Sequence, residues 1–282
     1  MKYLLLVSLT FLYTSCSHTT KDRSAEGHQG FTSIFDGQTL NGWKIIEKPE
    51  SHNYHATEEN FFVKDGAIHC YQLPNKKGGL LISETTYADF ELEMEIHSDW
   101  GCDSGIFLRC TEDGHGIQVL NDYLPSGCVG FLYGQGTGGF ISRPIRLYQH
   151  PDANNNSKGY AKDLYDGVAI DGLLYSIDAE GWNKLWLPDT WNTIRIRCEG
   201  LEPVVTTWIN GVKVMTMDGT TYKARHLRDE NAQKWSAAPA WNRERVEQVT
   251  GGRGSIAVQV HPGTRWKPGG SAKYRNIRIR EL

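Results

Sequence analysis

Apolar and polar residues alternate with a period of two along most of the chain after residue 30. In residues 87–97, one face would carry Phe90, Leu92, Met94 and Ile96, and the other Glu91, Glu93, Glu95 and His97. Residues 194–198 and 204–209 alternate in the same way, and Asn210-Gly211 then begins a turn. This pattern predicts half-buried β-strands joined by hairpins.

Residues 99–122 hold two short apolar runs, at 104–109 and 117–122, joined by a turn-like segment. We predict a β-hairpin in the middle of a sheet. Arg109 and Gln118 interrupt the apolar runs. A buried polar group costs free energy unless it is hydrogen-bonded or contacts a ligand. We therefore interpret this hairpin as the floor of a sugar site.

The chain shows no long apolar stripe of helical period, and many short strands with turn signals indicate a sandwich or a barrel. We expect one domain over residues 31–282, interrupted by two long loop insertions at residues 135–187 and 219–252. Long irregular loops in compact domains are usually functional or disordered. The Tyr and Trp residues scattered through these two argue against disorder, so we expect the insertions to wall a cleft.

The N-terminus has the composition of a targeting segment. Lys2 precedes an apolar stretch at residues 4–13 that is too short to span a bilayer, and Thr14-Ser15 then lead to Cys16. We predict a lipoprotein signal over residues 1–16 with lipidation at Cys16, the alternative being an ordinary secretory signal. Residues 17–30 are polar and predict a flexible tether. The protein is then exported and lipid-anchored in a bacterial cell envelope, with no other membrane contact.

The net charge and the cysteine spacing bear on a nucleic-acid partner and on a zinc site. The net charge is −3 and no Lys/Arg block occurs, which argues against a nucleic-acid partner. The spacing of the five later cysteines fits no zinc pattern and predicts mostly buried free thiols: Cys70, Cys102, Cys110, Cys128 and Cys198.

Several short motifs, in order, resemble those of one family. Phe-Asp-Gly-Gln-Thr-Leu-Asn-Gly-Trp at residues 35–43 resembles its opening signature. Further matches are Tyr-Ala-Asp-Phe-Glu-Leu at 87–92, Ser-Gly-Ile-Phe-Leu-Arg at 104–109, Ile-Gln-Val-Leu at 117–120, Leu-Tyr-Gly at 132–134, Trp-Asn-Thr at 191–193, Trp-Ile-Asn-Gly at 208–211 and Tyr-Arg-Asn-Ile-Arg-Ile at 274–279. The family is that of the 3-keto-disaccharide hydrolases, also described as 3-keto-glucoside 1,2-lyases and 3-keto-2-hydroxyglucal hydratases.

The resemblance implies an all-β, concanavalin A-like jelly-roll sandwich and a secreted enzyme acting on a carbohydrate. The relatives usually carry an acid at the position of Gly116, and a late strand of theirs ends in Gln-Asp-His where this chain has Gln259-Val260-His261. These departures leave the general base, and a divalent cation as a cofactor, open.

A 3-keto substrate sets its own chemical demands. The ketone makes the C2 proton acidic, so a base removes it, the C1 oxygen leaves, and water adds back. Such a site needs a base near C2, donors for the enolate oxygen and an acid for the leaving group.

Strand parity places Arg109 on the face of Gly105 and Phe107, and Gln259 on the face of His261. We therefore expect Arg109, Gln118, Gln259 and His261 to converge, with Asp103 and Asp122 at one edge of the hairpin. The predicted catalytic residues are His261, Arg109, Asp103 and Asp122, and the predicted substrate-binding residues are Gln118, Gln259, Glu84 and Tyr133.

Other interpretations are open for the same residues. Arg109 could be a buried salt-bridge partner, His261 a loop histidine, and the two aspartates turn residues. Glu91, Glu93 and Glu95 resemble the acidic strand of some glucanases, but we interpret them as a solvent-facing strand edge. The alternatives for the whole chain are a non-catalytic glycan-binding module and a conventional two-carboxylate glycoside hydrolase.

Overall fold

The computed structural model describes residues 30–46, 56–136, 142–150, 158–164, 170, 172–221 and 252–282. The predicted signal at residues 1–16, including Cys16, nearly all of the tether, and most of the second insertion lie outside these ranges. In the described part, no helix is long and apolar enough to cross a membrane.

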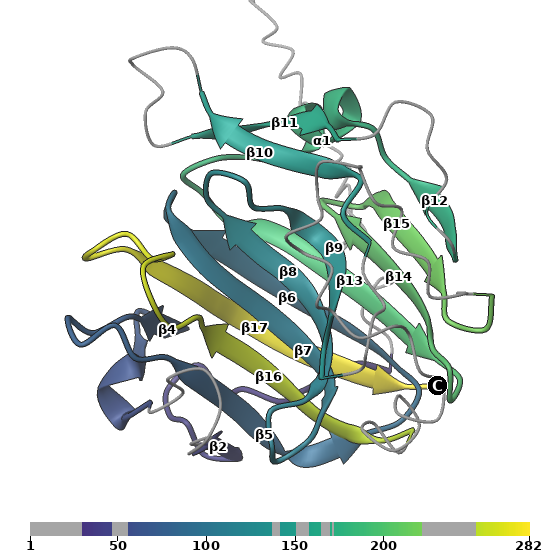
Figure 1. Cartoon of the computed structure of the whole chain (residues 1–282). Helices are drawn as coiled ribbons and strands as arrows, with labels where there is room; N and C mark the ends of the chain where they lie inside the picture. The colour runs from purple at the N-terminus through teal and green to yellow at the C-terminus, as the bar shows by residue number, and fades with distance from the viewer. Residues whose placement is uncertain are drawn as a thin grey trace, which may run out of the picture. The chain divides into compact units, whose positions relative to one another are not determined.

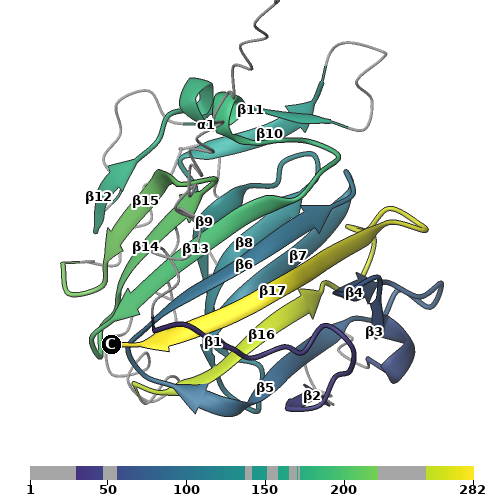
Figure 2. The ribbon, with the colours of Figure 1, turned by 180° about the vertical axis from the view of Figure 1, so that it is seen from behind.

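Two antiparallel sheets form the body of the domain (Figure 1). Sheet A runs in the order β12 (Leu173–Ser176), β15 (Val212–Asp218), β14 (Val204–Ile209), β13 (Asn192–Glu199), β6 (Phe90–Ser98), β17 (Ser271–Glu281), β4 (Ala67–Tyr71) and β3 (Phe61–Lys64), with β1 (Thr32–Ser33) on β17. Sheet B runs β2 (Trp43–Ile46), β5 (Gly79–Tyr87), β16 (Gly254–Val260), β7 (Cys102–Cys110), β8 (Gly116–Tyr123) and β9 (Val129–Gln135). Figure 2 shows β1 and β3 from behind.

The core lies between the two sheets and follows from the alternation in the sequence. The predicted inner face of β6 is buried, since Phe90, Leu92 and Ile96 are 0% exposed. Ile106 and Val119 of sheet B belong to the same apolar cluster. The predicted sandwich is therefore confirmed, and so is the hairpin, because β7 pairs with β8 from Cys102–Tyr123 to Leu108–Ile117.

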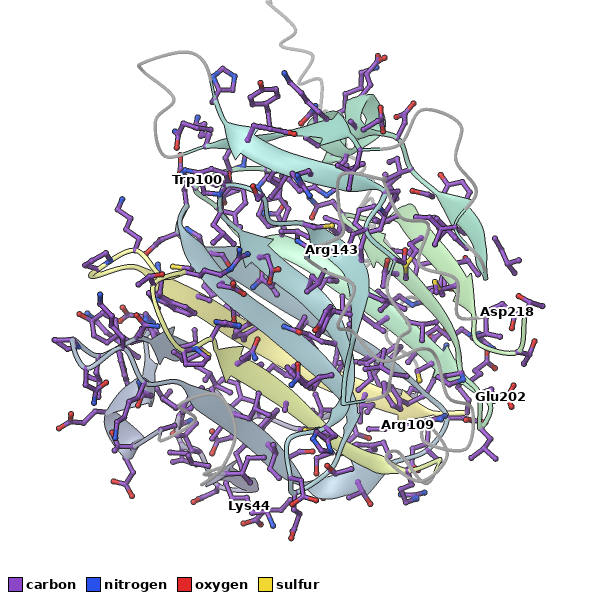
Figure 3. All side chains as sticks on the ribbon, in the orientation of Figure 1. Lys44, Trp100, Arg109, Arg143, Glu202 and Asp218 are labelled. Carbon is purple, nitrogen blue, oxygen red and sulfur yellow. The ribbon has the colours of Figure 1, made fainter. Side chains whose placement is uncertain are left out.

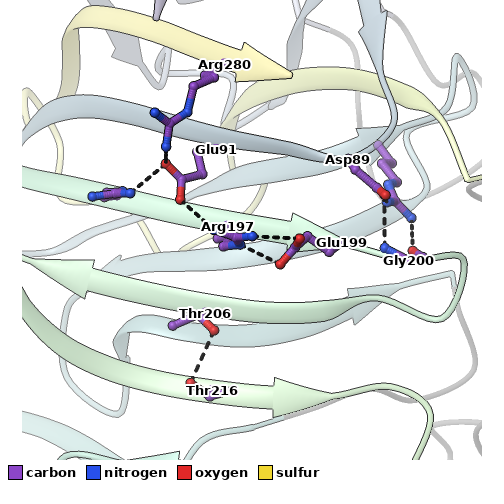
Figure 4. A network of polar contacts seen from close by, with 10 residues as sticks. Asp89, Glu91, Arg197, Glu199, Gly200, Thr206, Thr216 and Arg280 are labelled. Atoms are coloured by element: carbon purple, nitrogen blue, oxygen red, sulfur yellow. Dashed lines mark hydrogen bonds and ion pairs between the residues drawn. The ribbon is translucent and has the colours of Figure 1, made fainter. Parts of the chain in front are cut away.

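The outer face of sheet A carries the three predicted outward glutamates, but not at an edge. β6 pairs with β13 on one side and β17 on the other, so it is a central strand. Glu91 is 1% exposed and contacts Arg195, Arg197 and Arg280 at 2.6–3.2 Å (Figure 4). These glutamates thus belong to cross-strand ion pairs, and their interpretation as a strand edge was wrong.

The first insertion has secondary structure of its own. β10 (Ile145–Gln149) and β11 (Gly159–Asp163) form a separate hairpin, and α1 (Ala179–Leu185) packs on β11. Asp178 begins the helix by accepting a hydrogen bond from Gly181 N at 2.7 Å, as an N-cap does. A 3-10 turn, Glu58–Asn60, precedes β3. The five described cysteines are buried and free, as predicted.

Candidate active site

Two carboxylates meet on the outer face of sheet B. Asp103 on β7 is directly opposite Asp122 on β8, so the prediction that they share one edge of the hairpin is confirmed. Their chain neighbours Ser104 and Asn121 point the other way, into the core, where both contact the Tyr274 hydroxyl at 2.7 and 2.9 Å. Because side chains alternate across a strand, Asp103 and Asp122 face outward.

The two carboxylates have different surroundings. Asp103 forms an ion pair with the Nε of Arg265. Asp122 lies 4.0 Å from the guanidinium of Arg143, and among the described residues its Oδ1 atom has no hydrogen-bond partner. Burial raises the pKa of Asp122 well above its usual value, and the negative charge of Asp103 acts in the same direction. The surroundings of Asp122 therefore favour its protonated form.

Two glutamines lie next to this pair on the same face. Gln118 Nε2 donates to Gln259 Oε1 at 2.8 Å, which joins β8 to β16 across β7. The Gln118 side chain can pass over β7 because the β7 residue beneath it is a glycine. A Cβ added to Gly105 would lie 2.0 Å from Gln118 Nε2. Tyr133 is opposite Gln118 on β9 and half-buried. The structure thus brings three of the four predicted substrate-binding residues together.

His261 lies at the same end of sheet B, just beyond β16. Its backbone N donates to Asp103 O at 3.2 Å, and its Nδ1 is 2.7 Å from Pro262 O. Since a carbonyl only accepts, Nδ1 carries the proton in this contact, and Nε2 is the nitrogen that can accept one. The backbone of His261 is therefore next to that of Asp103, and its imidazole is half-buried.

Arg109 does not join these residues, although parity along β7 predicted that it would. Between Ala257–Phe107 and Ser255–Cys110, β7 has one residue more than β16, and Arg109 has a positive φ of 51°. This β-bulge reverses the side-chain alternation, so the Arg109 side chain turns away from the outer face. Six residues of extended strand, about 20 Å, also separate it from Asp103. In Figure 3, Arg109 lies well below Arg143, toward the end of the sheets where Glu202 is labelled.

The Arg109 side chain is fully buried and connects the two sheets. It donates to Ala88 O at 2.8 Å, to Gly200 O at 2.7 Å and to Asp89 Oδ1 at 2.8 Å. Asp89 also accepts from Gly200 N at 2.9 Å (Figure 4). These contacts match the alternative of a buried salt-bridge partner, and Arg109 has no place beside the carboxylate pair.

Glu84 is also placed apart from the pair. β5 aligns Leu80 with Gln259 and Thr86 with Ser255, so Glu84 lies toward the Arg109 end. Its side chain is exposed. The prediction that Glu84 lies near the hairpin floor is therefore wrong, because antiparallel pairing carries β5 away from the Asp103 end as the chain advances.

Arg265 and Arg143 are the residues that the sequence analysis missed. Arg265 lies in the turn after His261, and Arg143 lies in the first insertion. Both are far from the hairpin in sequence and belong to no strand motif. The one available signal was physical: two carboxylates buried side by side require compensating positive charge.

The positive charges of Arg265 and Arg143 also bear on whether this site could hold a divalent cation as a cofactor. In the described ranges, no group of three or more His, Cys, Asp and Glu side chains is placed to hold a metal ion. The two carboxylates that would bind one already face Arg265 and Arg143. This donor set does not fit a divalent cation, and no step below uses one.

A family model described as the 3-keto-alpha-glucoside-1,2-lyase-like domain matches residues 30–280. A 3-keto-disaccharide hydrolase of Bacteroides thetaiotaomicron is 28% identical over 169 residues, which cover 55% of this chain and 51% of the relative. The match therefore spans about half of that relative's length.

Two solved structures can be set beside the fold. β-Agarase B of Zobellia galactanivorans has a TM-score of 0.48 at 13% identity, covering 89% of this chain and 92% of that one. The β-glucanase of Bacillus licheniformis has a TM-score of 0.41 at 12% identity, covering 85% and 92%. Since the family model extends over nearly the whole described domain, the chain belongs to the 3-keto-alpha-glucoside-1,2-lyase-like family of carbohydrate-active proteins.

Proposed function

We propose that this protein cleaves 3-keto-glycosides by elimination and hydration at the Asp103–Asp122 pair. The observation that carries the proposal is the contrast within the pair: one carboxylate is ion-paired, while burial favours the protonated form of the other. Neighbouring carboxyl groups with opposed environments supply a base and an acid at the same pH.

The reaction divides into an elimination and a hydration. Asp103 removes the C2 proton, and the electron pair of the C–H bond delocalises onto the C3 oxygen as an enolate. The enolate collapses, a C1–C2 double bond forms, and the C1–O bond breaks while Asp122 protonates the leaving oxygen. Water then adds its hydroxyl to C1 and a proton to C2, which regenerates the 3-keto sugar.

Three neighbouring side chains have supporting roles in this proposal. Arg143 is a cation for the developing enolate oxygen. Gln118 donates an N–H to Gln259, so Gln118 Oε1 is the atom that would accept a hydrogen bond from a sugar hydroxyl. His261, through its Nε2 atom, is the second candidate for the base that removes the C2 proton.

The test uses a 3-keto-glucoside in D2O, with the product analysed by mass spectrometry and NMR. Elimination and hydration place deuterium at C2, whereas direct hydrolysis by two carboxylates leaves the C2 hydrogen in place. Enzyme-free substrate and product, incubated separately, correct for spontaneous exchange. Incubation with and without a chelator tests the metal-free mechanism.

Variants then assign the roles. Asp103→Asn and Asp122→Asn are expected to lower kcat by about 10²- to 10⁴-fold, the usual contribution of a positioned acid or base. Asp113→Asn, an exposed change in the turn between the same strands, is the matched control and retains full activity. Absence of turnover, together with binding of unmodified glycans, would instead indicate a binding module.

Export belongs to the same proposal. We infer from residues 1–16 that the protein is lipidated at Cys16 and held in the cell envelope. The wild-type protein should partition into detergent after expression in a bacterial host, and Cys16→Ser should move to the aqueous phase. Equal partitioning of the two proteins would exclude a lipid anchor at this residue.

A further inference from the structure

A cavity of about 430 Å³ lies in the first insertion, between β11, α1 and the segment that follows the helix. Its lining includes His150, Lys158, Tyr160, Trp182, Asn183 and Trp186. Its volume is in the range of small-molecule binding sites. None of these residues takes part in the chemistry proposed above.

The cavity and the carboxylate pair lie on opposite sides of β8. Asp122 faces outward, whereas the next residue, Tyr123, faces inward and is fully buried. The Tyr123 ring contacts Trp186 with 5.0 Å between ring centroids. A ligand in the cavity is therefore separated from Asp122 by the strand itself.

Packing fixes the two tryptophans that support the cavity from behind, since Trp182 is 0% and Trp186 is 5% exposed. Trp182 and Trp186 are stacked with centroids 5.4 Å apart and planes 15° apart. Trp182 Nε1 donates to Val129 O at 3.1 Å, which fixes this pair to sheet B. A rigid wall of this kind reduces the entropy lost when a ligand binds.

The polar part of the lining is fixed as well. Asn183 accepts from Ala161 N at 2.7 Å and donates to Ala161 O at 3.0 Å, which ties the helix to β11. Gly159 N donates to the Tyr123 hydroxyl at 3.1 Å on the same side. The site is thus built on a helix and a strand.

Charge decides which ligand fits. Lys158, the cation of the lining, lies 3.8 Å from the carboxylate of Asp189, so its charge is balanced. Lys162 lies over the Tyr160 ring at 5.4 Å from its centroid. The half-buried Tyr160 and His150 rings then offer apolar faces and edges beside N–H and O–H groups. Apolar rings with a few polar groups and balanced charge suit a neutral, hydroxyl-rich ring.

We propose that this cavity is a second carbohydrate site, which binds one neutral sugar residue of a glycan away from the carboxylate pair. It would hold the protein on a polymeric or branched glycan while the active site acts elsewhere. This proposal does not depend on the elimination mechanism, because the ligand binds without reacting.

The test measures binding and turnover separately on the full domain. Saturation-transfer NMR and titration calorimetry are run with maltohexaose, cellohexaose, mannohexaose, xylohexaose and the N-glycan core pentasaccharide as neutral probes. Hyaluronan hexasaccharide is the anionic probe. At least one neutral probe is expected to bind and to receive saturation transferred from aromatic protons of the protein. The anionic probe is expected to bind more weakly.

Variants locate the site. Tyr160→Ala and His150→Ala should each weaken binding by about tenfold, which corresponds to 1.4 kcal/mol, and leave turnover of a 3-keto-glucoside unchanged. Tyr175→Ala, an exposed tyrosine on β12 outside the cavity lining, is the matched control and should bind as the wild type does. Thermal melts confirm that each variant is folded.

Three outcomes would overturn the proposal: no neutral probe binds, the anionic probe binds more tightly, or Tyr160→Ala and His150→Ala both bind like Tyr175→Ala. If binding is lost in the cavity variants while the wild type shows no turnover, the second site stands and the proposed reaction fails. The two proposals can therefore fail independently.

Discussion

Replacing Arg109 by alanine tests whether this residue holds the sheets together or takes part in catalysis. Its guanidinium is fully buried and donates to two backbone carbonyls and to Asp89. The acceptors belong to the turns at 88–89 and at Gly200, so one side chain joins β7 of sheet B to two turns that border sheet A. Alanine removes all three hydrogen bonds and leaves a cavity.

The magnitude can be estimated from these contacts. Hydrogen bonds that involve a charged group contribute about 1.5–3 kcal/mol each. The pair with Asp89 contributes less, about 0–1 kcal/mol, because that carboxylate is 45% exposed and well solvated. The two carbonyl bonds then dominate, and a loss of about 3–6 kcal/mol is expected. In a domain of this size each kcal/mol lowers Tm by about 2–4 °C.

The assay is urea denaturation followed by tryptophan fluorescence, with turnover measured on the folded protein below the transition. Arg109→Lys keeps the charge but cannot reproduce the planar fork, so it should destabilise by an intermediate amount. Arg253→Ala is the matched control. Its side chain is 52% exposed, and both of its contacts, with an exposed glutamate and with the backbone oxygen of the exposed Thr86, are solvated, so about 0–1 kcal/mol is expected.

One result would refute this reasoning. If Arg109→Ala unfolds at the same urea concentration as the wild type while its turnover collapses, Arg109 acts chemically and the connection between the sheets is incidental. Loss of stability with normal turnover per folded molecule would confirm the structural role.

Asp122 has a raised pKa in the folded protein, so between its unfolded and folded pKa values the native state binds the extra proton and stability falls as pH rises, by about 1.4 kcal/mol per pH unit. Asp122→Asn should remove this slope in urea titrations across pH, and an unchanged slope would contradict the assignment. Gly105→Ala should displace the Gln118 side chain and raise KM, since the added Cβ would lie 2.0 Å from Gln118 Nε2 and 2.6 Å from its Cγ and Cδ. A normal KM would show that Gln118 does not contact substrate. Gly254→Ala should lower Tm clearly, because its Cβ would lie 2.4 Å from the backbone carbonyl carbon of Arg109, and a melt like that of the wild type would count against the tight packing at the bulge.

The fold and part of the site could be predicted because they depend on local patterns. Alternation of period two specified the buried face of strands such as β6 and β13, and the hairpin turn specified that Asp103 and Asp122 would be partners. Gln118, Gln259 and Tyr133 followed from the same parity. These relations hold wherever strands stay regular.

The errors have a common physical cause. Parity failed for Arg109 because one extra residue in β7 creates a bulge, and a single bulge reverses every inference made beyond it. Glu84 was misplaced because its distance from the pair depends on the register between β5 and β16, which no local pattern encodes.

By itself, the sequence determined the class of fold, the alternation of the strands and the juxtaposed carboxylates, since all of these arise from neighbours along the chain or across one turn. Only the tertiary structure decided which cations face the carboxylates, that burial raises the pKa of Asp122, and which groups Arg109 contacts. Burial and charge compensation depend on segments 20–160 residues apart, such as Arg143 and Arg265 beside the hairpin. Their positions are set by the packing of the whole domain.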